Sequence, residues 1–246
     1  MSTRSPSLMA RNGEAFAADE IPVFPPATFR ERVLQAVKEG ARLAAFFGRP
    51  AAQEALRLNA VLAHDSSGGL SWLATDVRDA FASLTPDCPQ AHGFEREIAE
   101  QWGVRPEGHP WLKLIRYHAS HDPGGDAWGR PAGAIIQPGV GDFFQVRGQE
   151  IHEVAVGPVH AGIIEPGHFR FQCHGEKVLH LEIALGYQHR GIERALAGGP
   201  AKRTIHYLET LAGDTTVGHA LAYCQAIEAL GNDSTPARAN ALRGVA

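Results

Sequence analysis

The hydrophobic and polar positions at the start of the chain predict a helix after an irregular segment. Residues 1–27 are rich in Ser, Pro and Ala, which predicts a mobile tail. A helical period begins at Thr28, where Glu31 completes a capping-box pattern, and Gly and Pro in residues 48–50 end it. The apolar stripe of this helix is Phe29, Val33, Val37, Ala44 and Phe47.

The next segments alternate between strand and helix patterns. Residues 56–62 and 70–74 repeat with a period of two around a Ser- and Gly-containing turn, which predicts a hairpin. Residues 81–84 follow as a third strand candidate. A helix is predicted from about residue 91 to residue 102, because apolar residues recur at i, i+4 and i+8, and Gly103 suits its end.

The second half of the chain predicts a small sheet followed by helices. Phe169 and Phe171 alternate with polar residues, and a turn at Gly175 and Glu176 leads into an apolar return strand. The other strand candidates are residues 143–146 and 151–156, and a strand-to-helix junction is expected at residues 187–193. Helices are predicted over residues 201–211 and 216–230, with a last one that starts at Thr235 and Pro236.

These patterns predict an α+β fold in two parts. After the tail, residues 28–117 form a small α+β domain, and residues 118–142 form a linker rich in Gly and Pro. Residues 143–246 form the sheet and the helices that follow it. The predicted helices after about residue 195 have apolar stripes with little to cover them, so we expect this region to expose a large apolar patch and to be prone to aggregation.

Composition and charge exclude several classes of protein. The 246 residues are 44% hydrophobic and 20% charged, with a net charge of −4, so the chain has no basic footprint for nucleic acid. No run of eighteen apolar residues and no signal-peptide pattern is present, which predicts no direct membrane span. The three scattered cysteines, Cys88, Cys173 and Cys224, favour a reducing cytoplasm and argue against a disulfide framework or a metal cluster held by this chain alone.

Three motifs in the second half identify a resemblance. In order, they are GPVH at residues 157–160, EPGHFRF at residues 165–171 and GYQHRGIE at residues 186–193. Together they resemble the N-terminal sheet shared by nickel–iron hydrogenase large subunits and the quinone-site subunit of respiratory complex I. The formate hydrogenlyase and hydrogenase-4 type of large subunit is the most similar. The resemblance implies a subunit of a membrane-associated oxidoreductase, cytoplasmic and held at the inner face of the cell membrane through its partners.

A second resemblance covers the first half of the chain. The order FxSLTP, EREIxExxG and EGHP, over residues 81–110, resembles the small α+β subunit of complex I, which is fused to the quinone-site subunit in several complexes. The resemblance implies an interface role for these residues, whereas the sequence alone favours a solvated helix face. Glu95 and Glu97 are two apart on a helix and do not face each other, which makes them a poor acid–base pair. The interface candidates are Glu95, Arg96, Glu97, Glu100, Gly108, His109 and Pro110.

The residues that carry the family's chemistry are replaced in this chain. The first cysteine pair that binds nickel and iron falls on Ala212 and Thr215, and neither side chain supplies a thiolate. The quinone-pocket tyrosine falls near Gly213, and the pocket histidine falls near Glu165 and Pro166. We therefore expect no metal and no other cofactor bound by this chain. Iron–sulfur clusters are expected in partner subunits, with quinone or NAD(H) at the level of the complex.

Several polar residues remain as candidates around the altered cavity. Glu165, Asp214 and His219 are the catalytic candidates. The cofactor-binding candidates are His160, His168, His189 and Arg190. Structural roles compete with these: Asp214 suits a helix N-cap, and His189 with Glu193 suits a helix i,i+4 pair. His174 and His180 flank the hairpin turn and are expected to face solvent.

Two functions from different classes are open. The first is a peripheral-arm subunit of the oxidoreductase, or an N-terminal piece of it, with an iron–sulfur small subunit packed on the domain that begins near Ile151 and membrane subunits beneath. The second is a non-catalytic assembly or interaction subunit that keeps only the docking surface.

Overall fold

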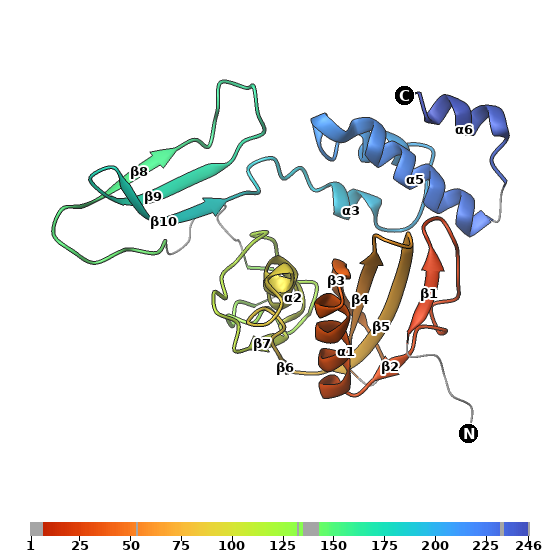
Figure 1. The fold of residues 1–246 in the computed structure, drawn as a ribbon, viewed down its shortest axis with the longest axis horizontal. Coiled ribbons are helices and arrows are strands. Elements are labelled where there is room, and N and C mark those ends of the chain that lie inside the picture. Colours follow the sequence, from red (N-terminus) through yellow and green to blue (C-terminus); the bar gives the residue numbers. More distant parts are fainter. Residues whose placement is uncertain (1–6, 53, 132, 135–142, 232–233, 246) are drawn as a thin grey trace. The chain divides into compact units, whose positions relative to one another are not determined.

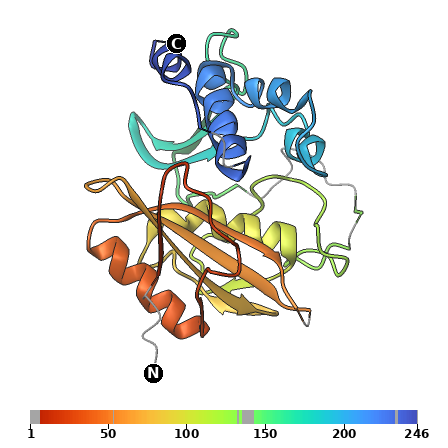
Figure 2. The same cartoon turned by 90° about the vertical axis from the view of Figure 1, so that its right-hand side faces the viewer.

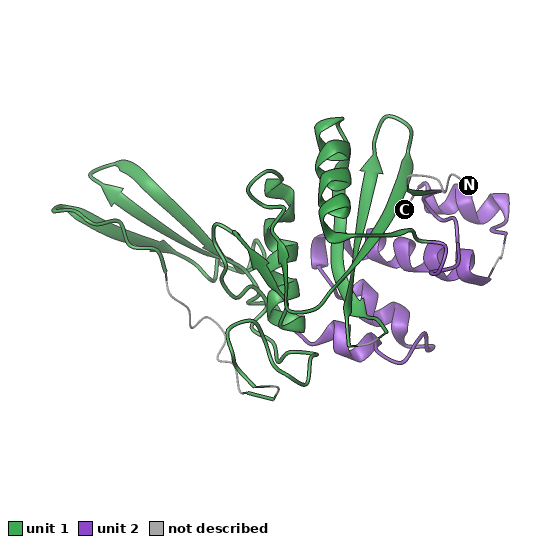
Figure 3. Cartoon of the chain, turned by 90° about the horizontal axis from the view of Figure 1, so that it is seen from below, with its two compact units in different colours: residues 1–8, 21–188 green, residues 9–20, 189–246 purple. Residues whose placement is uncertain are grey.

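The computed structural model describes residues 7–52, 54–131, 133–134, 143–231 and 234–245. The chain divides into two compact units, shown in Figure 3. The first unit comprises residues 1–8 and 21–188, and the second comprises residues 9–20 and 189–246. Figure 1 gives the order of the helices and strands, whose mixture confirms the predicted α+β class.

The first unit contains an antiparallel sheet in the order β5-β4-β3. Its strands are β3 (Arg42–Pro50), β4 (Leu56–His64) and β5 (Gly69–Val77), and the short β2 (Val23–Phe24) runs parallel to β5. The helix α1 (Pro26–Lys38) packs on β4 and β5, and α2 (His92–Trp102) packs on β3 (Figure 2). The strands β6 (Ala80–Ala82) and β7 (Arg105–Glu107) form a separate parallel pair.

The core of this α+β part is made by the helices and the sheet together. Phe29 and Val33 on α1 meet Phe46 on β3, and the rings of Phe29 and Phe46 stack with centroids 5.9 Å apart. Leu58 on β4 is 0% exposed, and Ile98 on α2 closes the core from the other helix. Burial of this many apolar side chains is the main favourable contribution to folding.

The first helix ends earlier than the sequence pattern predicted. Gly40 has a φ of 98°, a left-handed value that ends a helix easily only at glycine, and α1 therefore stops at Lys38. Ala44 and Phe47 lie on the strand β3 instead. The hairpin over β4 and β5, α2 and its left-handed Gly103 match the prediction.

The three-stranded sheet of the first unit has the order β10-β9-β8. Its strands are β8 (Ile151–Val156), β9 (His168–His174) and β10 (Lys177–Ala184), all antiparallel, as the hairpin pattern predicted. The other predicted strand, at residues 143–146, is irregular chain. Its two phenylalanines pack instead against side chains of the sheet.

The larger part of the second unit, which begins at His189, is helical. Its elements are α3 (Ile192–Leu196), α4 (Thr204–Glu209), the 3-10 turn η2 (Gly213–Thr215), α5 (Thr216–Gly231) and α6 (Ala237–Arg243). Contacts link α3 with α4 and α4 with α5. The helix α5 is apolar around most of its circumference, yet none of its residues is buried.

The segment predicted as a tail contains two short strands. Residues 8–11 form β1 (Leu8–Arg11), residues 23–24 form β2, and Ala10 and Ile21 are buried. The two compact units do not divide at residues 118–142. The assignment of residues 28–117 and 143–246 to different family domains stays a prediction.

Candidate functional site

Glu95 on α2 is a buried carboxylate that binds the segment before the helix. It is 0% exposed, and it accepts hydrogen bonds of 2.6 Å from the Ser83 and Thr85 hydroxyls and from the Leu84 backbone amide. Three donors satisfy the carboxylate without water, which is what a buried charge requires. The solvated helix face that the sequence favoured is therefore wrong at Glu95.

Glu100 binds the segment that follows α2 in the same way. It is 0% exposed and accepts the backbone amides of Ile115, Arg116 and His118 at 2.8–3.1 Å. Arg96 donates to the Lys113 carbonyl at 2.8 Å and to the Leu114 carbonyl. Both charged side chains of α2 thus hold one stretch of backbone.

Glu97 is half-buried and makes a 3.1 Å ion pair with Arg116, so it adds a weaker tie to the same stretch. This arrangement places Glu95, Arg96 and Glu100 within the first unit rather than on its surface. If these residues contribute to an interface, they do so through the backbone of residues 83–85 and 113–118, which they hold in place.

His109 closes the turn that the EGHP motif predicted. Gly108 has a φ of 81°, and Pro110 follows His109 directly. The His109 side chain is 0% exposed; its Nε2 lies 3.2 Å from the His92 carbonyl and its Nδ1 accepts the Trp111 amide at 3.0 Å. This pairing needs the neutral ring with a proton on Nε2. Burial lowers the pKa of His109, and burial followed by the Arg96 charge lowers the pKa of His92.

Three candidates lie in the first unit around the loop between β8 and β9. His160 Nε2 lies 2.8 Å from the Gly167 carbonyl, and its ring stands edge-on to Phe169 at 5.7 Å. Glu165 is exposed in that loop. His168 begins β9, half-buried, with its ring against Phe143. His160 therefore serves to close the loop, and Glu165 lies at its exposed tip.

The other four candidates lie in the second unit. Arg190 donates to the carbonyls of Thr210 and Leu211, the latter at 3.2 Å, and so holds the end of α4. His189 is exposed and precedes α3, so His189 and Glu193 do not lie in one helix.

Asp214 and His219 lie at the turn into α5. Asp214 is exposed within η2, two residues before α5 begins at Thr216. His219 Nδ1 lies 2.9 Å from the Thr215 hydroxyl and 3.0 Å from the Thr215 carbonyl, which commits that nitrogen to its own turn.

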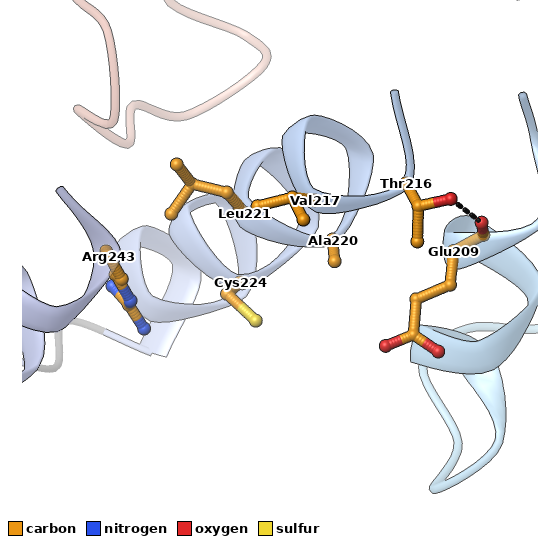
Figure 4. A pocket seen from close by; sticks show the side chains of 7 residues that line it. All are labelled: Glu209, Thr216, Val217, Ala220, Leu221, Cys224 and Arg243. Atoms are coloured by element: carbon orange, nitrogen blue, oxygen red, sulfur yellow. Dashed lines mark hydrogen bonds between the residues drawn. The ribbon is translucent and has the colours of Figure 1, made fainter. Parts of the chain in front are cut away.

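A pocket of about 250 Å³ lies beside this turn and is shown in Figure 4. Two of its lining residues are joined by a hydrogen bond, because the Thr216 hydroxyl donates to the Glu209 carbonyl at 2.9 Å. The walls are mainly apolar, with the Glu209 carboxylate and the Arg243 guanidinium as the charged groups. The lining residues are Glu209, Thr216, Val217, Ala220, Leu221, Cys224 and Arg243. Sequence patterns had marked Cys224 only as part of an apolar stripe.

Among the described residues, no three side chains of His, Cys, Asp or Glu converge as a metal site would require. Cys88 and Cys173 are buried, and burial raises the pKa of the Cys88 thiol, so Cys88 is poorly suited to be a thiolate ligand.

Sequence reasoning missed a second group of polar residues, on the three-stranded sheet. Arg170 on β9 pairs with Glu153 on β8, and Glu182 on β10 binds Lys113 at 3.1 Å. His180, expected in solvent, is half-buried, with its ring 4.5 Å from that of Phe144. The period-two pattern of β9 and β10 does show a polar face, but it does not show that residues 111–113 and 143–144 cover it.

Comparison with known proteins bears on the resemblance drawn from the sequence. The homologues of the chain confirm its resemblance to the complex I and nickel–iron hydrogenase large-subunit type. No family model matches the chain.

The chain is similar to three curated proteins over about two thirds of its length. Hydrogenase-4 component G of Escherichia coli is 27% identical over 184 residues, which is 67% of this chain and 31% of that protein. Formate hydrogenlyase subunit 5 of Escherichia coli is 24% identical over 192 residues, 72% of this chain and 34% of that protein. The C/D subunit of NADH-quinone oxidoreductase from Bdellovibrio bacteriovorus is 24% identical over 177 residues, 67% of this chain and 31% of that protein. The chain therefore spans about a third of the length of these relatives.

Proposed function

We propose that the chain is a peripheral-arm subunit, or a part of one, in a membrane-associated oxidoreductase related to hydrogenase-4, formate hydrogenlyase and complex I. The homology over two thirds of the chain to subunits of those three systems supports this function most strongly. No helix in the described part of the chain combines the length and apolar character needed to cross a bilayer. Attachment to the cytoplasmic face of the membrane is therefore assigned to partner subunits.

The partners that fit this function are an iron–sulfur small subunit and membrane subunits. The three-stranded sheet offers the docking surface, since Val154, Leu181 and Ile183 on one face are 42–49% exposed. Apolar side chains gathered on one face of a sheet mark a contact surface. Electron carriers belong to the partners in this proposal, and quinone or NAD(H) acts at the level of the complex.

In this proposal, the chain binds no nickel–iron centre of its own. Ala212 and Thr215 stand where the resemblance places the first cysteine pair, and neither supplies the soft sulfur ligand that those metals need. Elemental analysis of the purified chain should give no stoichiometric nickel or iron. About one nickel per chain would overturn this part of the proposal.

The replacements also favour the second candidate, a non-catalytic assembly or interaction subunit. Purification of the tagged protein from membranes in mild detergent separates the two candidates. Co-purification with iron–sulfur and membrane subunits in a complex that transfers electrons supports the first. The same partners in a complex whose activity survives removal of this chain support the second, and recovery without any such partner contradicts both.

A further inference from the structure

The two faces of the three-stranded sheet differ sharply in polarity. The register aligns Val154, Phe171 and Leu181 in one row across the three strands, and Val156, Phe169 and Ile183 in the next. On the opposite face, one row is Glu153, Gln172 and His180, and the next is Ala155, Arg170 and Glu182. In an antiparallel sheet, the rest of the chain usually covers the apolar face and leaves the polar face in solvent. Here the first unit covers the polar side.

Two segments from outside the sheet cover that polar face, and we name them the two jaws. The first jaw is Trp111 with Lys113, and the second is Phe143 with Phe144. In the first jaw, the Lys113 ammonium lies 4.3 Å from the centroid of the Trp111 ring and 3.1 Å from Glu182 Oε1. The second jaw places Phe143 3.8 Å from the Arg170 guanidinium, as a cation–π contact.

Glu182 is the residue that both jaws share. Its Oε1 accepts the Lys113 ammonium, and its Oε2 accepts the Phe144 backbone amide at 2.9 Å. The Glu182 side chain is only 16% exposed, so these two donors replace most of its water. Between the jaws, the His180 ring lies 4.5 Å from Phe144 and 5.8 Å from Trp111, and its Nε2 is buried without a hydrogen bond.

The first jaw is itself fixed by α2. Arg96 holds the carbonyls of Lys113 and Leu114, and Glu100 holds the three amides just beyond. A continuous set of charge-assisted hydrogen bonds therefore runs from the buried face of α2, through residues 113–118, to the middle of β10.

We propose that Glu182 is a positioning residue that fixes the three-stranded sheet to the small α+β domain by binding both jaws at once. With its polar face covered by its own chain, the sheet presents its apolar face outward. Arg96, Glu97 and Glu100, which the resemblance marked as interface residues, then serve this joint within one chain. This inference does not depend on the redox function proposed above.

The test measures amide hydrogen exchange on the full chain by NMR, with the Phe144 amide as reporter. Glu182→Gln removes the ion pair and weakens the acceptor, so exchange at Phe144 should rise about tenfold. Lys113→Met should also raise exchange at the Phe144 amide severalfold, although Lys113 does not touch that amide. Without Lys113, the Glu182 carboxylate is no longer held in the position from which it accepts the Phe144 amide. A purely local bond would not respond to Lys113→Met.

Two controls make the outcome decisive. Glu176→Gln changes an exposed glutamate in the turn of the same hairpin and should leave the Phe144 amide as it is. Amides of β4 and β5 should keep their protection in every variant, which shows that the chain stays folded. An unchanged Phe144 amide in Lys113→Met would overturn the proposal. So would an equal rise in Glu176→Gln, or an equal loss of protection over β4 and β5.

Discussion

The small α+β part and the three-stranded sheet use similar apolar strand residues and bury them to different extents. On β4, Leu58 and Leu62 are 0% and 2% exposed, whereas on β10, Leu181 and Ile183 are 42% and 49% exposed. In the α+β part, α1 and α2 lie on the sheet and close the core. In the three-stranded sheet, the covering segments lie on the polar face.

This difference shows which part of the chain satisfies its buried polar groups and covers its apolar surface by itself. In the α+β part, even the two buried glutamates of α2 are fully bonded inside the unit. The three-stranded sheet is held on its polar face by ion pairs and aromatic contacts, and its apolar face remains exposed. Apolar surface of that kind is stabilised only when another surface covers it.

The largest expected effect comes from emptying a buried carboxylate site in the α+β part. Glu100→Ala would leave the amides of Ile115, Arg116 and His118 without their acceptor in a dry environment. We expect the free energy of unfolding to fall by about 3–5 kcal/mol in urea denaturation. Glu97→Ala, which removes a half-exposed ion pair from the same helix, should cost about 0–1 kcal/mol. Equal losses in the two variants would show that the burial of Glu100 contributes nothing special.

The next prediction compares the two sheets directly. Leu58→Ala removes a fully buried side chain and should lower the free energy of unfolding by about 3 kcal/mol. Ile183→Ala, on the open face of β10, should cost less than about 1 kcal/mol and should reduce aggregation in light scattering. A cost of about 3 kcal/mol at Ile183 would mean that this face is already covered in the isolated protein, and the contrast between the sheets would fail.

The sequence predicted the elements better than their environments. The hairpin of β4 and β5, the helix α2 and the hairpin of β9 and β10 follow from periods of two and 3.6 and from turn residues. The end of α1 was missed, because Ala44 and Phe47 continue a helical spacing by chance and only the left-handed Gly40 breaks it. Burial of Glu95 and Glu100 could not be read from a charged helix face, since the donors that satisfy them lie in segments whose paths depend on tertiary contacts.

The candidate site was predictable only in part, for the same reason. Motif spacing gave the positions of His160 and Arg190, but their bonds to backbone carbonyls appear only in three dimensions. The role of Glu182 had no sequence signal, because its two partners lie 69 and 38 residues away.

The third prediction concerns the pH dependence of the free energy of unfolding, which we assign to two histidines of the α+β part. Burial lowers the pKa of His92 and His109 in the folded state, so the unfolded chain binds more protons below its ordinary histidine pKa of about 6.5. The two neutral histidines contribute fully to the free energy of unfolding above that pH, and this contribution is lost as the pH falls below it. Between pH 7.5 and 5.5, the free energy of unfolding should drop by about 1 kcal/mol.

His109→Gln should flatten that dependence, while His174→Gln, which changes an exposed histidine of the β9–β10 hairpin, should leave it as steep. A pH dependence that disappears in His174→Gln and persists in His109→Gln would place the acid sensitivity in the sheet.

The smallest expected effect lies in the second unit, at the contact between α5 and α6. Hydrogen bonds from Arg243 and Thr235 lower the pKa of Glu228 to about 2, although the carboxylate lies at the surface. The folded pKa lies below the unfolded one, so this contact contributes above about pH 4.5 and is lost as the pH falls toward 2. Arg243→Ala should return the pKa of Glu228 most of the way to its ordinary value in an NMR titration, with only a slight change in thermal unfolding, because exposed ion pairs contribute little. Arg238→Ala, on the same helix, should leave the Glu228 titration unchanged. If Arg243→Ala leaves the pKa of Glu228 low, then Arg243 does not set that pKa, and this pair does not link α6 to α5.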